Sequence, residues 1–148
     1  MIGKWISIDG CEGSGKTTFV NELKKQCPDL VYVPEFSDSI MGKVLSESVK
    51  KDPYIISNSI IGATLLFISD YFAMVETIIK PNISKGKHVI SDRGFSSKIA
   101  VNYAVMSESY DDQIVKTFFL ELFKLSPIPD HTIIFDMPFE LIKKRLIN

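Results

Sequence analysis

Residues Gly10–Thr17 read GCEGSGKT, and this stretch decides the fold of the chain. It fits the phosphate-binding loop, in which a glycine, four free positions and a second glycine precede Lys and then Ser or Thr. The flanks fit as well, because the strand-like run Lys4–Asp9 precedes the loop and Thr17–Gln26 can continue it as a helix. A strand, a loop and a helix in this order predict a nucleotide-binding α/β domain.

The residue types in this loop suit a nucleoside triphosphate. Glycines allow backbone N–H groups to turn toward the phosphates, and the N-terminus of the following helix favours an anion. The ammonium of Lys16 can reach the β- and γ-phosphates, and the hydroxyl of Thr17 can bind Mg²⁺. A glycine-rich turn with an incidental lysine is the alternative, but the order of the flanking elements favours the phosphate loop.

The composition is typical of a soluble globular protein. The 148 residues are 45% hydrophobic and 24% charged, and a chain of this size can bury a core as one domain. The formal net charge of −1 argues against a broad nucleic-acid-binding face. No repeat, low-complexity tract or linker-like stretch occurs, so we expect residues 1–148 to form a single domain.

The cysteines and the apolar runs predict a cytoplasmic protein without a membrane partner. Cys11 and Cys27 are too few for a zinc site built from four cysteines, and a disulfide at Cys11 would interfere with the phosphate loop. Near the N-terminus, Asp9 and Glu12 interrupt any secretory-type apolar stretch. The most apolar run, Ile60–Ile68, is too short to span a bilayer.

Apolar runs of strand length alternate with longer segments of helical period. This alternation predicts an α/β fold with a mostly parallel sheet flanked by helices. We expect strands at residues 4–9, 30–33, 88–91 and 131–136, and helices at 17–26, 39–50, 57–80, 95–106, 111–124 and from about 138 onward. Ser39 should be the N-cap of its helix, and Asp111 and Asp112 should open theirs rather than bind a metal.

The longest helical candidate, residues 57–80, should bury one face. Its apolar residues recur at spacings of three and four, namely Ile61, Leu65, Ile68, Phe72, Val75 and Ile79. Pro81 should end or kink this helix, and the stretch Lys85–Lys87 should form its stop.

Polar side chains follow the predicted strands at their carboxyl ends. They are Asp9, Glu35, Asp92, Arg93 and Asp136. Ligands of open α/β sheets bind outside the carboxyl ends of the strands. We therefore expect these side chains to converge around one crevice, although Asp92-Arg93 could also be a salt-bridged surface turn.

Five stretches together are more specific than the phosphate loop alone. They are Ile8–Thr18, Leu65–Phe67, Ile79–Pro81, Ser91–Arg93 with Ser97 and Ala100, and Pro129–Asp136. In order and spacing they resemble the thymidylate kinase family of nucleoside monophosphate kinases. The resemblance implies a P-loop NTPase fold with three α/β/α layers, of which this chain holds four strands and lacks a fifth.

The resemblance also implies transfer of the γ-phosphate of Mg·ATP to dTMP, which gives dTDP. Such a transfer needs two anionic substrates held in line and their charge neutralised. The catalytic residues would be Lys16 on the donor, Asp92 beside Mg²⁺ through water, and Arg93 on the acceptor's 5′-phosphate, with Thr17 as a direct metal ligand. The residues that hold ATP would be Gly10, Cys11, Glu12, Gly13, Ser14, Gly15, Lys16, Thr17 and Thr18.

Three further residues match the family's acceptor pocket. Glu12 matches the acidic loop position that contacts the 3′-hydroxyl of the acceptor sugar, Phe67 the aromatic that stacks on its base, and Ser97 a residue that lines the pocket. Other roles remain open for two of them. Glu12 could be a solvated loop carboxylate, and Phe67 could be an ordinary core residue of an amphipathic helix.

The chain departs from the family where acceptor-binding arginines are expected. Pro34–Phe36 contains none after the second strand, and Tyr71 occupies an arginine position of the long helix. Neither Phe nor Tyr can replace the charge and paired donors of arginine. Lys98 could supply lost positive charge or select a different base, and Asn102 could offer its amide to the base.

The C-terminal region departs as well. In the family, the helix matching Phe139–Leu146 leads into a mobile lid, and that lid supplies a catalytic arginine when the phosphate loop has none. This sequence reaches Asn148 at that point, and Arg145 is the remaining candidate. Loss of such an arginine costs on the order of 10³ or more in rate, so we expect very weak transfer from these 148 residues alone.

Alternative functions stay open beside a dTMP kinase. They are a kinase for another (deoxy)nucleotide, a deoxynucleoside kinase, and a catalytically impaired nucleotide-binding scaffold. The missing arginines favour the scaffold, whereas Lys16, Thr17 and Asp92 argue against it. The resemblance further suggests a homodimer formed through the helices near residues 57–80 and 95–106.

Overall fold

The computed structural model of the protein describes residues 2–51 and 59–147. The chain packs into two compact units. The sheet unit comprises Met1–Glu35, Ile79–Gly94 and Pro129–Asn148, and the helical unit comprises Phe36–Ile78 and Phe95–Ile128.

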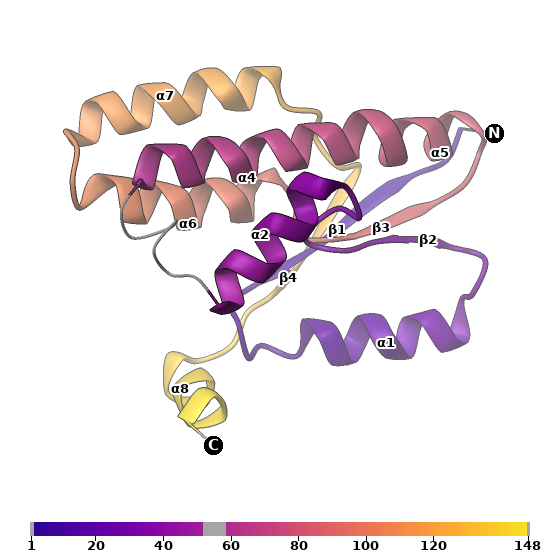
Figure 1. Ribbon diagram of the computed structural model, residues 1–148. Helices are drawn as coiled ribbons and strands as arrows, with labels where there is room; N and C mark the ends of the chain where they lie inside the picture. The colour runs from indigo at the N-terminus through magenta and orange to yellow at the C-terminus, as the bar shows by residue number, and fades with distance from the viewer. Residues whose placement is uncertain (1, 52–58, 148) are drawn as a thin grey trace. The chain divides into compact units, whose positions relative to one another are not determined.

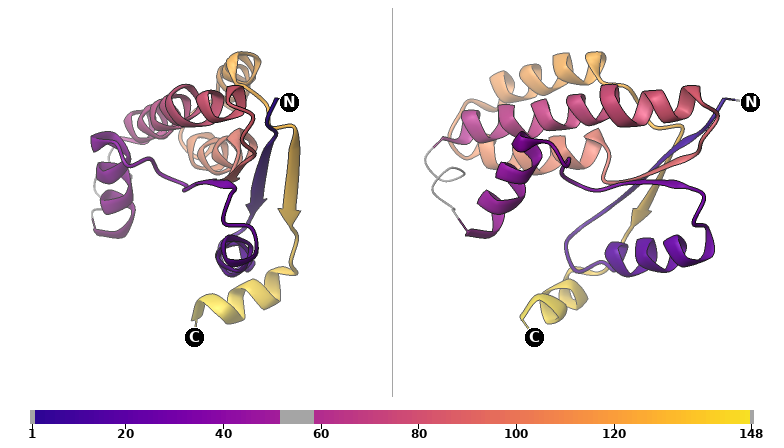
Figure 2. Two further views of the ribbon diagram at one scale, coloured as in Figure 1. Left: turned by 90° about the vertical axis from the view of Figure 1, so that its right-hand side faces the viewer. Right: turned by 45° about the vertical axis from the view of Figure 1, so that its right-hand side comes forward.

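The sheet unit contains a four-stranded, fully parallel sheet (Figure 1). Its strands are β1 (Trp5–Gly10), β2 (Val31–Val33), β3 (Val89–Asp92) and β4 (His131–Phe135), in the order β2-β3-β1-β4. Its helices are α1 (Lys16–Gln26), α5 (Lys80–Ser84) and α8 (Phe139–Ile147). Figure 2 shows β1 and β4 side by side, and β3 pairs with the other edge of β1, so the loop that follows β1 emerges from the middle of the sheet.

A small apolar core fixes α1 against the sheet. Ile8, Val20 and Ile90 are buried, and five partly buried side chains pack around them, namely Ile6, Leu23, Leu30, Tyr32 and Phe135. Each such aliphatic side chain contributes roughly 1.5–3 kcal/mol when fully buried. This packing holds the first turn of α1, and with it the phosphate loop, at the end of β1.

The helical unit consists of α2 (Ile40–Lys51), α4 (Ile60–Met74), α6 (Phe95–Ser107) and α7 (Asp112–Leu125). Neighbours pack in the order α2, α4, α6 and α7. Aromatic rings form much of its interior: Tyr71 stacks on Phe95 with 5.0 Å between ring centroids, and Phe72 meets Phe95 edge-on at 5.7 Å.

The predicted elements are present, with boundaries shifted by a few residues. Ser39 caps α2 through its Oγ, which accepts a hydrogen bond from the N–H of Gly42 at 3.0 Å. Asp111 caps α7 by accepting from the N–H groups of Gln113 and Ile114. The predicted start of the long helix at Ser57 lies outside the described residues.

Two predictions for the long helix need correction. Of the end or kink predicted at Pro81, the end is wrong: a π-helical segment, Val75–Ile79, precedes α5, which continues to Ser84, and the helix stops in the predicted stretch Lys85–Lys87. Proline has no N–H to donate and its ring crowds the preceding turn, and a widened turn relieves both problems. Secondly, Ile61 and Leu65 are 43% and 48% exposed instead of buried.

The buried face of α4 is shifted relative to the predicted one. It includes Ala63, Thr64, Ile68, Asp70 and Tyr71. The spacing of apolar residues could not show this shift, because Thr64 and Asp70 are buried through hydrogen bonds to other parts of the helical unit.

One described helical stretch, Ile60–Ser84, is long and apolar enough to cross a membrane by length and composition. The most apolar 18 residues of this stretch have a mean hydropathy of 1.4, and 39% of this segment is buried within the protein. This is weak support for a membrane span, since core helices of soluble proteins satisfy the same criterion.

Candidate functional site

The phosphate loop has a backbone that requires glycine. Gly10 has φ 137°, and a Cβ there would lie 2.6 Å from the carbonyl oxygen of Phe135. Gly15 is the N-cap of α1 in the left-handed conformation, with φ 97°. The N–H of Ser14 donates to the carbonyl of Cys11 at 3.2 Å and closes the turn. The motif therefore forms a true loop between β1 and α1, as predicted.

Lys16 lies across this loop. Its Nζ donates to the carbonyl oxygens of Gly10 and Cys11, each at 2.7 Å, and the residue is 7% exposed. Burial lowers the pKa of Lys16 below its ordinary value, and the nearby positive charge of Arg93 lowers it further, against the opposing effect of acidic neighbours. The ammonium is thus already placed at the loop that the sequence assigned to the triphosphate.

The ends of three strands meet beside the loop. Nε of Arg93 lies 2.7 Å from Oε1 of Glu35, which follows β2, and Nη1 of Arg93 donates to the carbonyl of Gly10 at 3.1 Å. The N–H of Gly94 donates to Oδ1 of Asp9 at 2.8 Å. The predicted convergence of strand-end side chains is therefore present for β1, β2 and β3.

Several buried polar atoms at this site lack a hydrogen-bond partner within residues 2–51 and 59–147. They are Oγ of Ser14, Oδ1 of Asp92 and Nε of Arg93. The contact of Arg93 with Glu35 is a charge contact that is not aligned as a hydrogen bond. Each buried polar atom without a partner costs about 1–3 kcal/mol, so these atoms indicate a place built for a polar ligand.

The donor set fits a magnesium–nucleotide complex. In the described part of the chain, no group of three or more His, Cys, Asp and Glu side chains could hold a metal by itself. Mg²⁺ typically takes one or two protein oxygens and completes its shell with phosphates and water. Asp92, with its unpartnered Oδ1, and the exposed Thr17 at the first turn of α1 suit this arrangement.

Arg145 also contacts the phosphate loop. Its Nη1 donates to the carbonyl of Gly13 at 2.9 Å, and the side chain of Leu146 lies next to Gly13. The sequence left Arg145 as the remaining candidate for the catalytic arginine. The structure adds that α8 carries this guanidinium to the donor loop.

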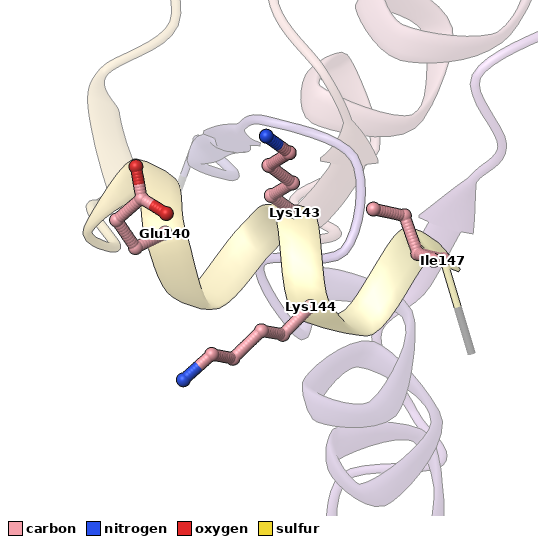
Figure 3. Close-up of a pocket in the computed structure, with 4 residues that line it drawn as sticks. All are labelled: Glu140, Lys143, Lys144 and Ile147. Carbon is pink, nitrogen blue, oxygen red and sulfur yellow. The ribbon is translucent and has the colours of Figure 1, made fainter.

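A cavity of about 290 Å³ lies on α8 and is lined by Glu140, Lys143, Lys144 and Ile147 (Figure 3). None of the predicted site residues lines it. The neighbouring Arg145, in contrast, contacts the phosphate loop.

In the helical unit, two aromatic rings and a lysine form a cluster. The rings of Phe36 and Phe67 lie 5.8 Å apart between centroids, and Nζ of Lys98 lies 5.2 Å from the centroid of Phe36. Lys98 is 5% exposed. We call these three residues the ring–lysine cluster. An ammonium over an aromatic face is attracted by the ring quadrupole by about 0.5–2 kcal/mol.

The other predicted acceptor residues lie in different surroundings. Nδ2 of Asn102 donates to the carbonyl of Lys98 at 2.8 Å, and Oδ1 of Asn102 accepts from Thr64 at 3.1 Å. Tyr71 is 1% exposed and its hydroxyl donates to the carbonyl of Pro127. Ser97 is half-buried on α6 in the helical unit, and Glu12 is exposed in the sheet unit.

Sequence reasoning missed a buried carboxylate that supports this region. Asp70 is fully buried, and it accepts hydrogen bonds from the N–H of Ser37 at 3.0 Å and from the hydroxyl of Ser37. It thereby ties the segment next to Phe36 to α4. The signal available in the sequence was an acid in the middle of an apolar helix, which rarely occurs without a partner.

Comparisons with known proteins agree with these features. A family model described as thymidylate kinase matches residues 8–148. The thymidylate kinase of Carboxydothermus hydrogenoformans is 33% identical over 146 residues, which are 95% of this chain and 69% of the relative. That of Mesoplasma florum is 34% identical, over 96% of this chain and 67% of the relative.

Solved structures show the same fold. The thymidylate kinase from Candida albicans superposes with a TM-score of 0.72 at 24% identity, covering 97% of this chain and 67% of that one. The enzyme from Ehrlichia chaffeensis gives 0.70 at 24% identity, covering 99% and 83%. The predicted α/β P-loop fold is confirmed, and the chain is shorter than these relatives.

Proposed function

The chain belongs to the thymidylate kinase family, and we propose that it transfers the γ-phosphate of Mg·ATP to dTMP, giving dTDP and ADP. As a member of this family, the protein is a kinase, that is, a phosphotransferase. The observation that carries the donor half of the proposal is the phosphate loop with Lys16 buried across it.

Donor binding is proposed for the sheet unit. The loop amides of residues 10–18 hold the β- and γ-phosphates, and Lys16 moves its ammonium from the loop carbonyls to phosphate oxygens. Thr17 and Asp92 would hold Mg²⁺, Asp92 through water, and the metal would neutralise charge that develops on the phosphates. Burial favours the exchange, because Lys16 gains a full negative partner in place of neutral carbonyls.

The residues proposed to bind the acceptor come from the sheet unit and from the helical unit. In the sheet unit, Arg93 takes the 5′-phosphate and Glu12 the 3′-hydroxyl of the sugar. In the helical unit, Phe67 stacks on the base, with Ser97, Lys98, Asn102 and Tyr71 as the other contacts. Lys98 supports this assignment most directly, because its buried ammonium lies over the ring of Phe36, which in turn contacts Phe67.

The chemical step needs little beyond position and charge. The nucleophile is an oxygen of the 5′-phosphate of dTMP, which attacks the γ-phosphorus in line while the bond between the γ-phosphorus and the bridging oxygen breaks and ADP leaves. Lys16, Arg93 and Arg145 are the cations available to stabilise the charge of the transferring group. The reaction therefore depends on how closely these side chains hold both substrates.

The test is transfer of phosphate from Mg·ATP to a panel of nucleoside monophosphates and deoxynucleosides. Diphosphate formation with dTMP as the preferred acceptor supports the proposal. Preference for another monophosphate assigns Phe36, Tyr71 and Lys98 to altered specificity, and preference for thymidine makes the protein a deoxynucleoside kinase. ATP binding without transfer to any acceptor supports the scaffold alternative.

A cytoplasmic homodimer formed through α4 and α6 is part of the proposal. Both helices expose apolar side chains within the helical unit, among them Ile61, Leu65, Val101 and Val105. Surfaces of this kind commonly mark protein interfaces. Light scattering of the purified protein should give twice the 16.7 kDa mass of the chain, and a monomeric mass would contradict it.

A further inference from the structure

Arg93 has an unusual backbone. It is the one non-glycine residue with positive φ, 72°, among the described residues. Residues other than glycine, asparagine and aspartate rarely adopt this backbone conformation. It persists where surrounding contacts enforce it. The contacts of Arg93 therefore identify the interactions that enforce this backbone conformation.

The backbone around Arg93 is held by strand β1. The N–H of Arg93 donates to the carbonyl of Ile8 at 2.9 Å, and the N–H of Gly94 donates to the buried carboxylate of Asp9 at 2.8 Å. These bonds fix the turn after β3, so the direction in which the side chain leaves the backbone is set by β1.

The side chain is held from a second direction. Oε1 of Glu35 lies 2.7 Å from Nε of Arg93, and the side chains are 36% and 17% exposed, respectively. Glu35 lies two residues beyond β2, in the stretch where the sequence analysis expected an arginine for the acceptor phosphate. This chain has an anion there, and that anion contacts Arg93.

We propose that Glu35 is a positioning residue that holds the Arg93 guanidinium ready for the 5′-phosphate of the acceptor. This inference rests on the proposed function of Arg93. Without a negative partner, Arg93 would be repelled by the ammonium of Lys16, which lies on the same loop carbonyl: both side chains donate to the carbonyl oxygen of Gly10. Glu35 offsets that repulsion and keeps both cations at one loop.

The geometry also leaves Arg93 able to bind. The charge contact with Glu35 is not aligned as a hydrogen bond, and no other described residue accepts a hydrogen bond from Nε of Arg93. A phosphate can take this donor without displacing an existing hydrogen bond. Glu35 thus orients the guanidinium without saturating it.

The first experiment compares Glu35→Gln with Glu35→Asp and with the control Glu22→Gln, an exposed acid paired with Lys25 on α1. We expect Glu35→Gln to raise the KM for dTMP about tenfold with kcat nearly unchanged, and Glu35→Asp to recover part of the loss. Binding of an ATP analogue and of thymidine should not change. An unchanged KM, or an equal loss of thymidine binding, would overturn the proposal.

A second experiment does not depend on activity. Because the chain has two arginines, Arg93 and Arg145, the side-chain Nε–H region of a ¹⁵N NMR spectrum should contain two signals, which Arg145→Lys assigns. We expect Glu35→Gln to shift and broaden the Arg93 signal and to leave that of Arg145 unchanged, whereas an unaffected Arg93 signal would overturn the proposal. If the wild-type protein phosphorylates no monophosphate, the proposed function fails while this measurement still decides the role of Glu35.

Discussion

The phosphate loop of the sheet unit and the ring–lysine cluster of the helical unit are built in different ways. The loop is made by consecutive residues, and its shape depends on backbone carbonyls, amides and glycine conformations. The cluster is made by three side chains from the segment after β2, from α4 and from α6. A site made of backbone allows little variation, whereas a site made of side chains can change its chemistry without a change of fold.

This difference explains where the chain keeps to its family and where it departs. The loop retains every position of its pattern, but the arginines expected near Phe36 and Tyr71 are absent. Tyr71 instead stacks in the interior of the helical unit. Substitutions at the two sites should therefore differ in size and in kind.

The largest effect is expected at the loop. Lys16→Met removes the buried ammonium that contacts two loop carbonyls. We expect kcat/KM for phosphate transfer to fall by about 10³-fold or more, since Lys16 is the residue proposed to carry positive charge to the β- and γ-phosphates. Lys25→Met, at an exposed position on the same helix, should retain activity. Near-normal turnover by the Lys16→Met variant would contradict the view that the phosphate loop allows less variation than the ring–lysine cluster.

The second effect concerns the support of the ring–lysine cluster. Asp70→Ala leaves the N–H and hydroxyl of Ser37 without their buried acceptor. We expect a loss of about 2–3 kcal/mol in the free energy of unfolding, measured in urea. Asp38→Ala, an exposed neighbour of Ser37, is the matched control. Equal stability of the two variants would show that the buried carboxylate does not anchor this segment.

A smaller and more selective effect is expected at Lys98. Lys98→Met keeps the length of the side chain and removes the ammonium over Phe36. The KM for dTMP should rise about tenfold while the affinity for ATP stays constant, because one charged hydrogen bond to the acceptor is lost. Lys116→Met, exposed on α7, controls for charge. An unchanged acceptor KM would remove Lys98 from the acceptor site.

The smallest effect is expected in the sheet unit, at the end of β1 opposite the phosphate loop. Lys4 and the N–H of Trp5 donate to the carboxylate of Asp130 at 2.6 and 2.9 Å, and these bonds lower its pKa below 3.8. A lowered pKa in the folded state stabilises the protein above pH 3.8, and this contribution disappears as the pH falls below the folded-state value. Asp130→Asn should lower the unfolding temperature slightly near pH 7. That difference should shrink toward pH 3, and a difference independent of pH would contradict the assignment.

The sequence by itself determined the parts that depend on short-range geometry. The phosphate loop, its flanking strand and helix, and the parallel α/β arrangement follow from glycine conformations and from apolar periodicity, which neighbouring residues express locally. The convergence of Asp9, Glu35 and Arg93 followed from the rule that strand ends meet at one edge. These expectations needed no knowledge of side-chain packing.

The tertiary structure alone decided which face of α4 is buried, how the helix accommodates Pro81, and which side chains pair. Glu35 with Arg93, Asp70 with Ser37 and Lys98 with Phe36 are separated by 58, 33 and 62 positions in the sequence. No periodic pattern relates residues so far apart. Such pairs are selected by the free energy of burying charge with a partner, and that free energy exists only once the chain has folded.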